Sequence, residues 1–229
     1  MPDPEDQDDL ATAPRVRWWM ITLAVLGIAG VAFAVGRFST FGASAPAADP
    51  TTSSPEAGFS RDMQVHHAQA IEMAMETYRK TDDDELRILS YDIATGQAGQ
   101  RGEMYDWLVQ WGLPQAGGAP MAWMAESDAG HDHGVPDDEP LTDEEARDVM
   151  GMASDSELDA LAAATGAEAD CLFLELMIRH HEGAIPMADA VIELGSEPRV
   201  LAVAGSIRTG QSAEIEAMQS MQQRLGCGG

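Results

Sequence analysis

Hydrophobic residues recur with the period of amphipathic helices in four long stretches of the chain, and short polar or glycine-containing breaks separate these stretches. Ser60 is a candidate N-cap for the first stretch, and Gly195 ends the third. Because short turns join the helices in pairs, the pattern predicts two antiparallel hairpins that pack as an all-α, four-helix bundle. We expect these helices at about residues 60–79, 82–111, 168–194 and 198–225.

The two hairpins are copies of one another. The segment 63–74 matches 177–188 at its Met, His and Ala positions, and the segment 93–97 matches 207–211 at the same offset of 114 residues. A constant offset over more than fifty residues identifies a duplicated unit. We place repeat 1 at residues 59–112 and repeat 2 at 167–226, within a bundle domain of residues 59–229.

The linker between the repeats, residues 113–166, is loop-like over its first half. Its second half contains two capping boxes, Thr142 with Glu145 and Ser154 with Glu157. These boxes predict two short connecting helices.

An uninterrupted apolar run of 19 residues, 18–36, precedes the bundle. As a helix it is about 28 Å long, which is close to the thickness of the hydrocarbon core of a bilayer. It therefore predicts one N-terminal transmembrane helix. Two arginines before the run and one after it place the acidic tail, residues 1–17, in the cytosol and the rest of the chain outside the cytoplasm.

A cleaved signal sequence is the alternative, because small residues at 43–47 form candidate cleavage sites. We expect an uncleaved anchor and therefore a single-pass protein of the cell membrane, with a secreted protein as the second possibility. Residues 37–58 are rich in Ala, Pro, Ser and Thr, which is typical of a flexible tether.

The net charge of the chain limits the classes of partner that it is expected to bind. With 39 acidic and 13 basic side chains, the formal net charge is −26. A surface of this sign repels nucleic acids and anionic lipid headgroups, so we expect metal cations as partners, and no nucleic acid.

Two adjacent histidines lie on the inward face of the first helix of each repeat. Small alanines lie one turn away on the same face, and methionines lie on either side along the helix. Thioethers select Cu(I), and imidazole accepts copper in either oxidation state, so copper is the expected cofactor. The alternative interpretation is that these histidines are hydrogen-bonded core residues and the methionines fill space.

The second helix of each repeat contributes a further stripe. Gln211, Glu214 and Met218 share one face, whereas repeat 1 has Gln100 in place of the glutamate. Glu214 is expected either to bind the metal or to orient a histidine, or else to be solvated. The candidate metal ligands are His66, His67, His180, His181, Met63, Met73, Met177, Met187, Met104, Met218 and Glu214.

A third group of His and Met residues lies in the linker: Met121, Met124, His131, His133, Met150 and Met152. Because flexible loops do not preorganise ligands, we expect a solvated loop here rather than a metal site.

Cys171 and Cys227 are predicted at the same end of the bundle, and a disulfide would form readily outside the cytoplasm. Their register is marginal for a bridge, unless Gly226 turns the chain back over the helix end. The sequence leaves open whether they are bridged or are two free thiols.

The pattern Met-x-x-His-His-x-x-Ala-Ile-x-Met-Ala at 177–188, with the surrounding Cys, Phe, Gln and Glu positions, resembles the domain of unknown function 305 family over about residues 58–226. The resemblance implies a ferritin-like bundle in an exported or membrane-anchored bacterial protein, and some members bind copper. It also implies that the His-His pairs and neighbouring methionines are ligands. The chain departs from the family pattern at Gln100 and at Pro186. Pro186 removes a hydrogen bond inside a ligand helix and predicts a kink near Met187.

The function that the sequence favours is therefore copper binding, sequestration or relay outside the cytoplasm, without catalysis. A non-catalytic subunit that docks on an unidentified partner protein of the cell envelope is the alternative. A ferritin-like di-iron oxidase is a weaker candidate, because the chain contains no Glu-x-x-His motif.

Overall fold

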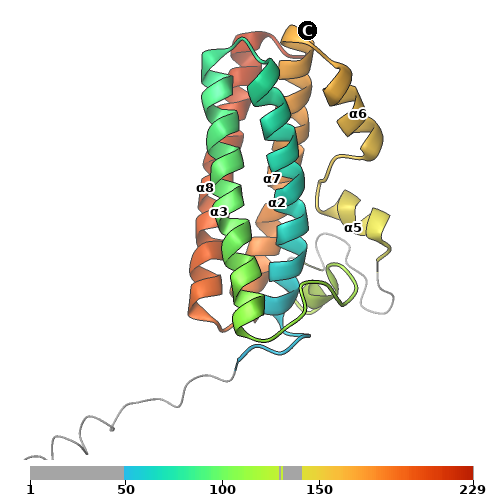
Figure 1. Cartoon of the computed structure of the whole chain (residues 1–229), viewed down its shortest axis with the longest axis vertical. Helices are drawn as coiled ribbons and strands as arrows, with labels where there is room; N and C mark the ends of the chain where they lie inside the picture. The colour runs from blue at the N-terminus through green and yellow to red at the C-terminus, as the bar shows by residue number, and fades with distance from the viewer. Residues whose placement is uncertain (1–48, 129, 131–140, 229) are drawn as a thin grey trace, which may run out of the picture. The chain divides into compact units, whose positions relative to one another are not determined.

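The computed structural model describes residues 49–128, 130 and 141–228, and the regular structure of these residues is helical (Figure 1). This result confirms the all-α class. The long helices are α2 (Pro55–Lys80), α3 (Asp84–Gln110), α7 (Gly166–Leu194) and α8 (Pro198–Leu225).

The long helices pair in chain order and form a bundle of two hairpins (Figure 1). Helix α2 packs closely against α3, α7 packs against α8, and α2 packs against α7 across the middle. The backbones of α3 and α8 approach each other less closely than those of the other neighbouring pairs. The face between α3 and α8 is therefore the looser side of the bundle.

Helix α2 begins earlier than its hydrophobic pattern predicted. Its N-cap is Ser54, whose side chain accepts a hydrogen bond from the Ala57 backbone N–H at 3.3 Å, and Pro55 occupies the first turn. Ser60 lies inside the helix, where its hydroxyl donates to the Glu56 carbonyl at 2.7 Å. The prediction of an N-cap at Ser60 was wrong, and residues 55–58 of the expected tether are helical.

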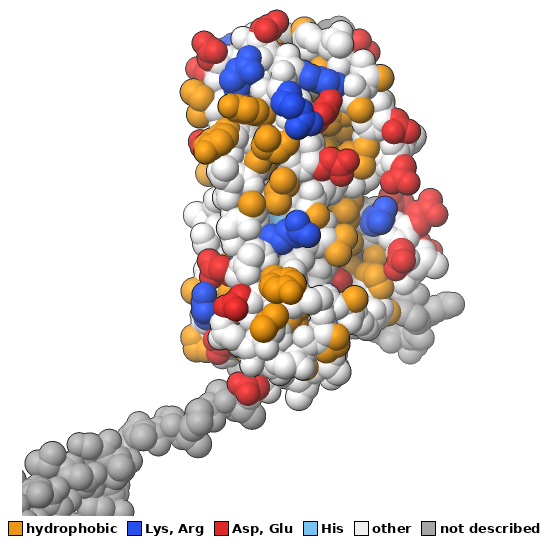
Figure 2. Space-filling model, viewed as in Figure 1, with side chains coloured by type: hydrophobic (Ala, Val, Ile, Leu, Met, Phe, Trp, Pro, Cys, Tyr) orange, Lys and Arg blue, Asp and Glu red, His pale blue; other side chains and the backbone are white. Residues whose placement is uncertain are grey.

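The linker forms a short 3-10 helix, η1 (Ala122–Met124), and the two predicted helices, α5 (Asp143–Val149) and α6 (Asp155–Ala163). Both predicted capping boxes are present. Helix α6 packs against α2 and α7, and Figure 2 shows acidic side chains along this edge of the molecule.

The linker methionines are part of the core. Met121, Met124, Met150 and Met152 are at most 5% exposed and pack in one cluster with Phe59 and Met187 of the bundle. The expectation of a solvated loop was therefore wrong for these four residues, because their apolar side chains gain more by packing against the bundle than by hydration. His131 and His133 lie outside the described residues.

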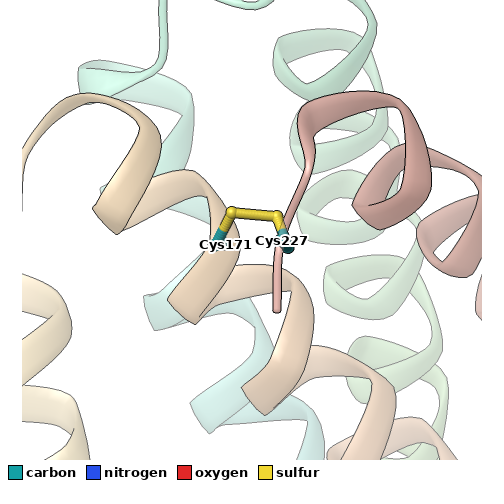
Figure 3. Close-up of a disulfide and its surroundings, with 2 residues drawn as sticks. All are labelled: Cys171 and Cys227. Atoms are coloured by element: carbon teal, nitrogen blue, oxygen red, sulfur yellow. A yellow bond between two sulfur atoms is a disulfide. The ribbon is translucent and has the colours of Figure 1, made fainter. Parts of the chain in front are cut away.

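A disulfide joins Cys171 in α7 to Cys227, with a Cα–Cα distance of 5.4 Å (Figure 3). Gly226 adopts the left-handed conformation with φ of 73°, so the chain turns back past the end of α8 toward α7. Of the two possibilities that the sequence left open, the structure contains the bridge.

The sequence predicts a kink near Met187, caused by Pro186. Helix α7 continues through Pro186, and Met187 is fully buried.

The predicted membrane helix, 18–36, lies outside the described residues, and none of the described helices combines the length and hydropathy that crossing a bilayer requires.

Candidate metal centre

The close pairing of α2 and α7 stacks one histidine from each repeat against the other. The ring centroids of His66 and His180 are 3.6 Å apart, and their planes are tilted by 32°. His67 and His181 flank this pair, with centroid distances of 6.3 Å and 6.2 Å to their neighbours in sequence. All four side chains are 0% exposed. Alanines one turn away keep the two helices close enough for this contact.

The two stacked histidines donate hydrogen bonds to backbone carbonyls. His66 Nε2 donates to the Met150 carbonyl oxygen in the linker at 3.0 Å. His180 Nε2 donates to the His66 carbonyl oxygen, also at 3.0 Å. Because a carbonyl oxygen only accepts, both rings carry their proton on Nε2.

The two flanking histidines bond to side chains of the outer helices. His67 Nε2 contacts Gln100 Oε1 of α3 at 2.8 Å, and His181 Nε2 contacts Glu214 Oε2 of α8 at 2.7 Å. These acceptors fix the same tautomer as in the stacked pair. The Glu214 side chain is 30% exposed, and its carboxylate orients the His181 ring through this hydrogen bond.

The other ring nitrogen, Nδ1, is buried and has no hydrogen-bond partner in any of the four histidines. Buried polar atoms without partners are rare, so four of them in one group require an explanation. An unprotonated Nδ1 has a free lone pair, which is the group that an imidazole offers to a metal ion.

Burial keeps three of these imidazoles, those of His66, His67 and His180, neutral. Loss of solvation, together with the neighbouring His67, lowers the pKa of His66 to about 3. Burial likewise lowers the pKa of His67 to about 4, against the opposing effect of the bond to Gln100. The pKa of His180 is also well below its usual range because of burial. A proton therefore does not compete for Nδ1 near neutral pH.

Methionines form a layer on each side of the histidines. Along α2 and α7 each His pair lies between two methionines, and the helices are antiparallel. The first methionine layer packs in one core cluster and the second in the other, and all six side chains are 0% exposed. The layers are Met63, Met104 and Met187, and Met73, Met177 and Met218.

The residues present fit a soft metal ion. In the described part of the chain, no three His, Cys, Asp or Glu side chains are grouped closely enough to hold a metal. The methionine layers on either side of the histidines are the available source of further ligands. Imidazole nitrogen with thioether sulfur is a donor set that suits Cu(I), whereas iron pairs require several carboxylates.

Sequence reasoning missed the contribution of the linker. Gly183 lies so close to the linker that an added Cβ would be 1.9 Å from the Met150 carbonyl oxygen. Gln69, at the equivalent position of repeat 1, holds the linker through two bonds with Ala153, of 2.8 Å and 2.7 Å. The mismatch of Gln69 and Gly183 between otherwise similar repeats was the available signal.

Comparisons with known proteins give a family and several solved structures of similar fold. The family model described as "Domain of unknown function (DUF305)" matches residues 56–222. A DUF305 protein of Streptomyces coelicolor is 36% identical, with a TM-score of 0.66 over 77% of this chain and 97% of its own. A DUF305 fragment from Deinococcus radiodurans is 31% identical, with a TM-score of 0.59 over 74% and 96%.

A further similar structure is CopM in its Cu(I)-bound form. It is 27% identical to this chain, with a TM-score of 0.53 over 75% of this chain and 96% of its own. CopM has also been solved with Cu(II) and with silver bound, and in an apo form. No curated protein matches the chain.

Proposed function

Since this chain belongs to the DUF305 family, we propose that it binds copper, chiefly as Cu(I), inside its four-helix bundle and holds or relays the ion outside the cytoplasm. The ligands in this proposal are drawn from the Nδ1 atoms of His66, His67, His180 and His181, no more than two of them at any one ion, with thioethers from the two methionine layers. Glu214 acts in it through His181 and not as a ligand.

One observation carries the proposal: four buried imidazoles keep an unpartnered Nδ1 between two buried layers of methionine. As plain core residues these histidines would leave four polar atoms unsatisfied, which is costly in an apolar interior. A Cu(I) ion removes that cost, because it takes lone pairs from nitrogen and sulfur and requires no hard oxygen ligand. The copper- and silver-bound forms of CopM add support from a relative.

Two features support a location outside the cytoplasm. The Cys171–Cys227 disulfide is stable in oxidising compartments. The similar protein of Streptomyces coelicolor is described as a candidate secreted protein. We propose that residues 18–36 anchor the chain as a single membrane-spanning helix, with a secreted form after cleavage as the alternative.

The test compares two pairs of histidines in the full chain. We expect His180→Ala with His181→Ala to weaken Cu(I) binding at least tenfold more than His131→Ala with His133→Ala, because packed helices hold the first pair in place. Titration against a chromophoric Cu(I) chelator measures both affinities. Equal losses would contradict the bundle site, and no binding by the unmodified chain would favour a structural role in the envelope.

Replacing sulfur at constant volume separates ligation from packing. Leucine at Met63, Met104 and Met187 should keep the fold but lower the Cu(I) affinity. The matched control has leucine at Met124, Met150 and Met152, which are buried in the same cluster. X-ray absorption at the copper edge should show sulfur ligands in the control and fewer in the test variant.

A further inference from the structure

A small cavity of about 60 Å³ lies between α3 and α8. Each lining residue on α3 has its counterpart on α8 at the repeat offset of 114, so the cavity lies on the axis that relates the two repeats. Its position is the side of the bundle where the helix backbones are farthest apart. The lining includes Gly96, Gln97 and Gln100 from α3 and Gly210, Gln211 and Glu214 from α8.

Two glutamines inside this cavity lack protein partners. Gln97 and Gln211 are 4% and 3% exposed, and neither the oxygen nor the nitrogen of either amide has a hydrogen-bond partner. Buried amides require partners, and a polar cavity of this size holds several waters. The interior of the cavity is therefore suited to water or to a partly hydrated ion.

The cavity lies one side chain away from the histidines, none of which is among its lining residues. Two of its lining residues, Gln100 and Glu214, accept the hydrogen bonds of His67 and His181. The opposite side of the histidine stack, along α2 and α7, is covered by the linker, whose Met150 carbonyl contacts His66 and whose Ala153 is held by Gln69. The α3–α8 face is therefore the side of the histidine stack that the linker does not cover and where the helix backbones pack least closely.

We propose that this α3–α8 cavity is the portal through which a soft monovalent cation, Cu(I) or Ag(I), reaches the buried histidines. This inference rests on the copper-binding function proposed above. The amides of Gln97 and Gln211 replace part of the ion's hydration on the way in, and the carboxylate of Glu214 attracts the ion to the opening. Gly96 and Gly210 keep the opening free of side chains, because no atom lies within 4 Å of a Cβ built at either position.

The test narrows the opening without touching a ligand. Gly96→Leu with Gly210→Leu in the full chain should slow both Cu(I) uptake from a chromophoric chelate and its release to excess chelator by at least tenfold. Because the two rates fall together, the affinity at equilibrium should stay within about twofold of the original. The matched control is Gly99→Leu with Gly205→Leu, which also have open space at the Cβ but lie outside the cavity lining, and which should leave both rates unchanged.

A second variant makes the lining of the cavity apolar and leaves its opening at Gly96 and Gly210 unchanged. Gln97→Leu with Gln211→Leu removes four unsatisfied polar atoms, so it should raise the melting temperature while it slows uptake. Unchanged uptake in both cavity variants overturns the portal but leaves the proposed copper site standing. A loss of equilibrium affinity in folded Gly96→Leu, Gly210→Leu protein also overturns it, because the cavity would then be part of the binding site. Failure of the unmodified chain to bind Cu(I) or Ag(I) would instead refute the proposed function.

Discussion

The two repeats share one ligand scaffold but surround it differently. In repeat 1, His67 bonds to the neutral amide of Gln100, whereas in repeat 2, His181 bonds to the carboxylate of Glu214. The stacked pair differs as well, because His66 bonds to the linker and His180 bonds to the backbone of repeat 1. A duplication therefore reproduces the position of each histidine, while single substitutions decide what each ring contacts.

The linker is the second difference between the repeats. In repeat 1, Gln69 forms hydrogen bonds with the linker. At the matching position of repeat 2, Gly183 has no side chain, which lets the linker backbone approach α7 closely. One edge of the bundle is therefore covered, and the α3–α8 edge is left looser. The asymmetry gives the histidine layer one closed side and one accessible side.

The largest effect should come from protonating the buried histidines of the metal-free protein. Their pKa in the folded chain is lowered, to about 3 for His66 and about 4 for His67, so below pH 6.5 the unfolded chain binds more protons than the folded one. The contribution of these histidines to the free energy of unfolding is therefore fully present above pH 6.5. It falls as the pH decreases toward 4, by up to about 1.4 kcal/mol per pH unit for each histidine. Urea denaturation from pH 8 to 4 measures this slope.

A variant assigns the slope to these residues. Replacing the repeat 1 pair, by His66→Asn with His67→Asn, should flatten the decline. The paired carboxylates of Asp83 and Glu157, whose arginine partners lower their pKa to about 2, add to acid lability below about pH 5. They do so equally in both proteins, so the difference between the two slopes reports the histidines. An unchanged slope between pH 6.5 and 4 in this variant would contradict the assignment.

The disulfide should give the next largest effect, and only repeat 2 has it. The positions that match Cys171 and Cys227 in repeat 1 are Ala57 and Leu113. Because the bridge closes a loop with a sequence separation of 56, its removal by Cys171→Ala with Cys227→Ala should cost about 4 kcal/mol in the chain-entropy model. Chemical denaturation with and without reductant measures this loss, and the double variant should be insensitive to reductant.

The linker contact should rank third. Gly183→Ala places a methyl group against the Met150 carbonyl, so we expect a destabilisation of about 2–3 kcal/mol from overpacking. Gly99→Ala on α3 is the matched control, since its Cβ meets open space and a helical alanine should stabilise by about 0.5–1 kcal/mol. Thermal melts of both variants decide, and equal melting temperatures would argue against the close approach of the linker to α7.

The smallest effect tests the two half-sites against each other. Glu214→Gln makes repeat 2 resemble repeat 1 and should weaken Cu(I) binding about tenfold, because a carboxylate partner increases the donor strength of a ligating imidazole. Gln100→Glu should act in the opposite direction. Chelator competition measures both variants, and the same change of affinity in both would show that the carboxylate does not distinguish the half-sites.

Much of this fold could be predicted from periodicity alone. The repeat offset of 114 and the inward positions of the His and Met residues follow from the sequence, and so do both capping boxes, because these features depend on neighbours a few residues away. The start of α2 was predicted incorrectly because Ser60 and Ser54 are both acceptable caps locally, and Pro55 decided between them.

Tertiary structure decided the features that make the histidines a candidate metal centre. The stacking of His66 on His180 depends on how closely two helices pack, and the Met150 carbonyl reaches His66 only because Gly183 leaves room for the linker. The disulfide likewise depended on the turn at Gly226, which no spacing rule fixes. The sequence by itself determined which residues of the four long helices face the core, since that is a matter of helical period. Contacts between distant segments determined that the linker methionines join the core and which nitrogen of each imidazole stays free.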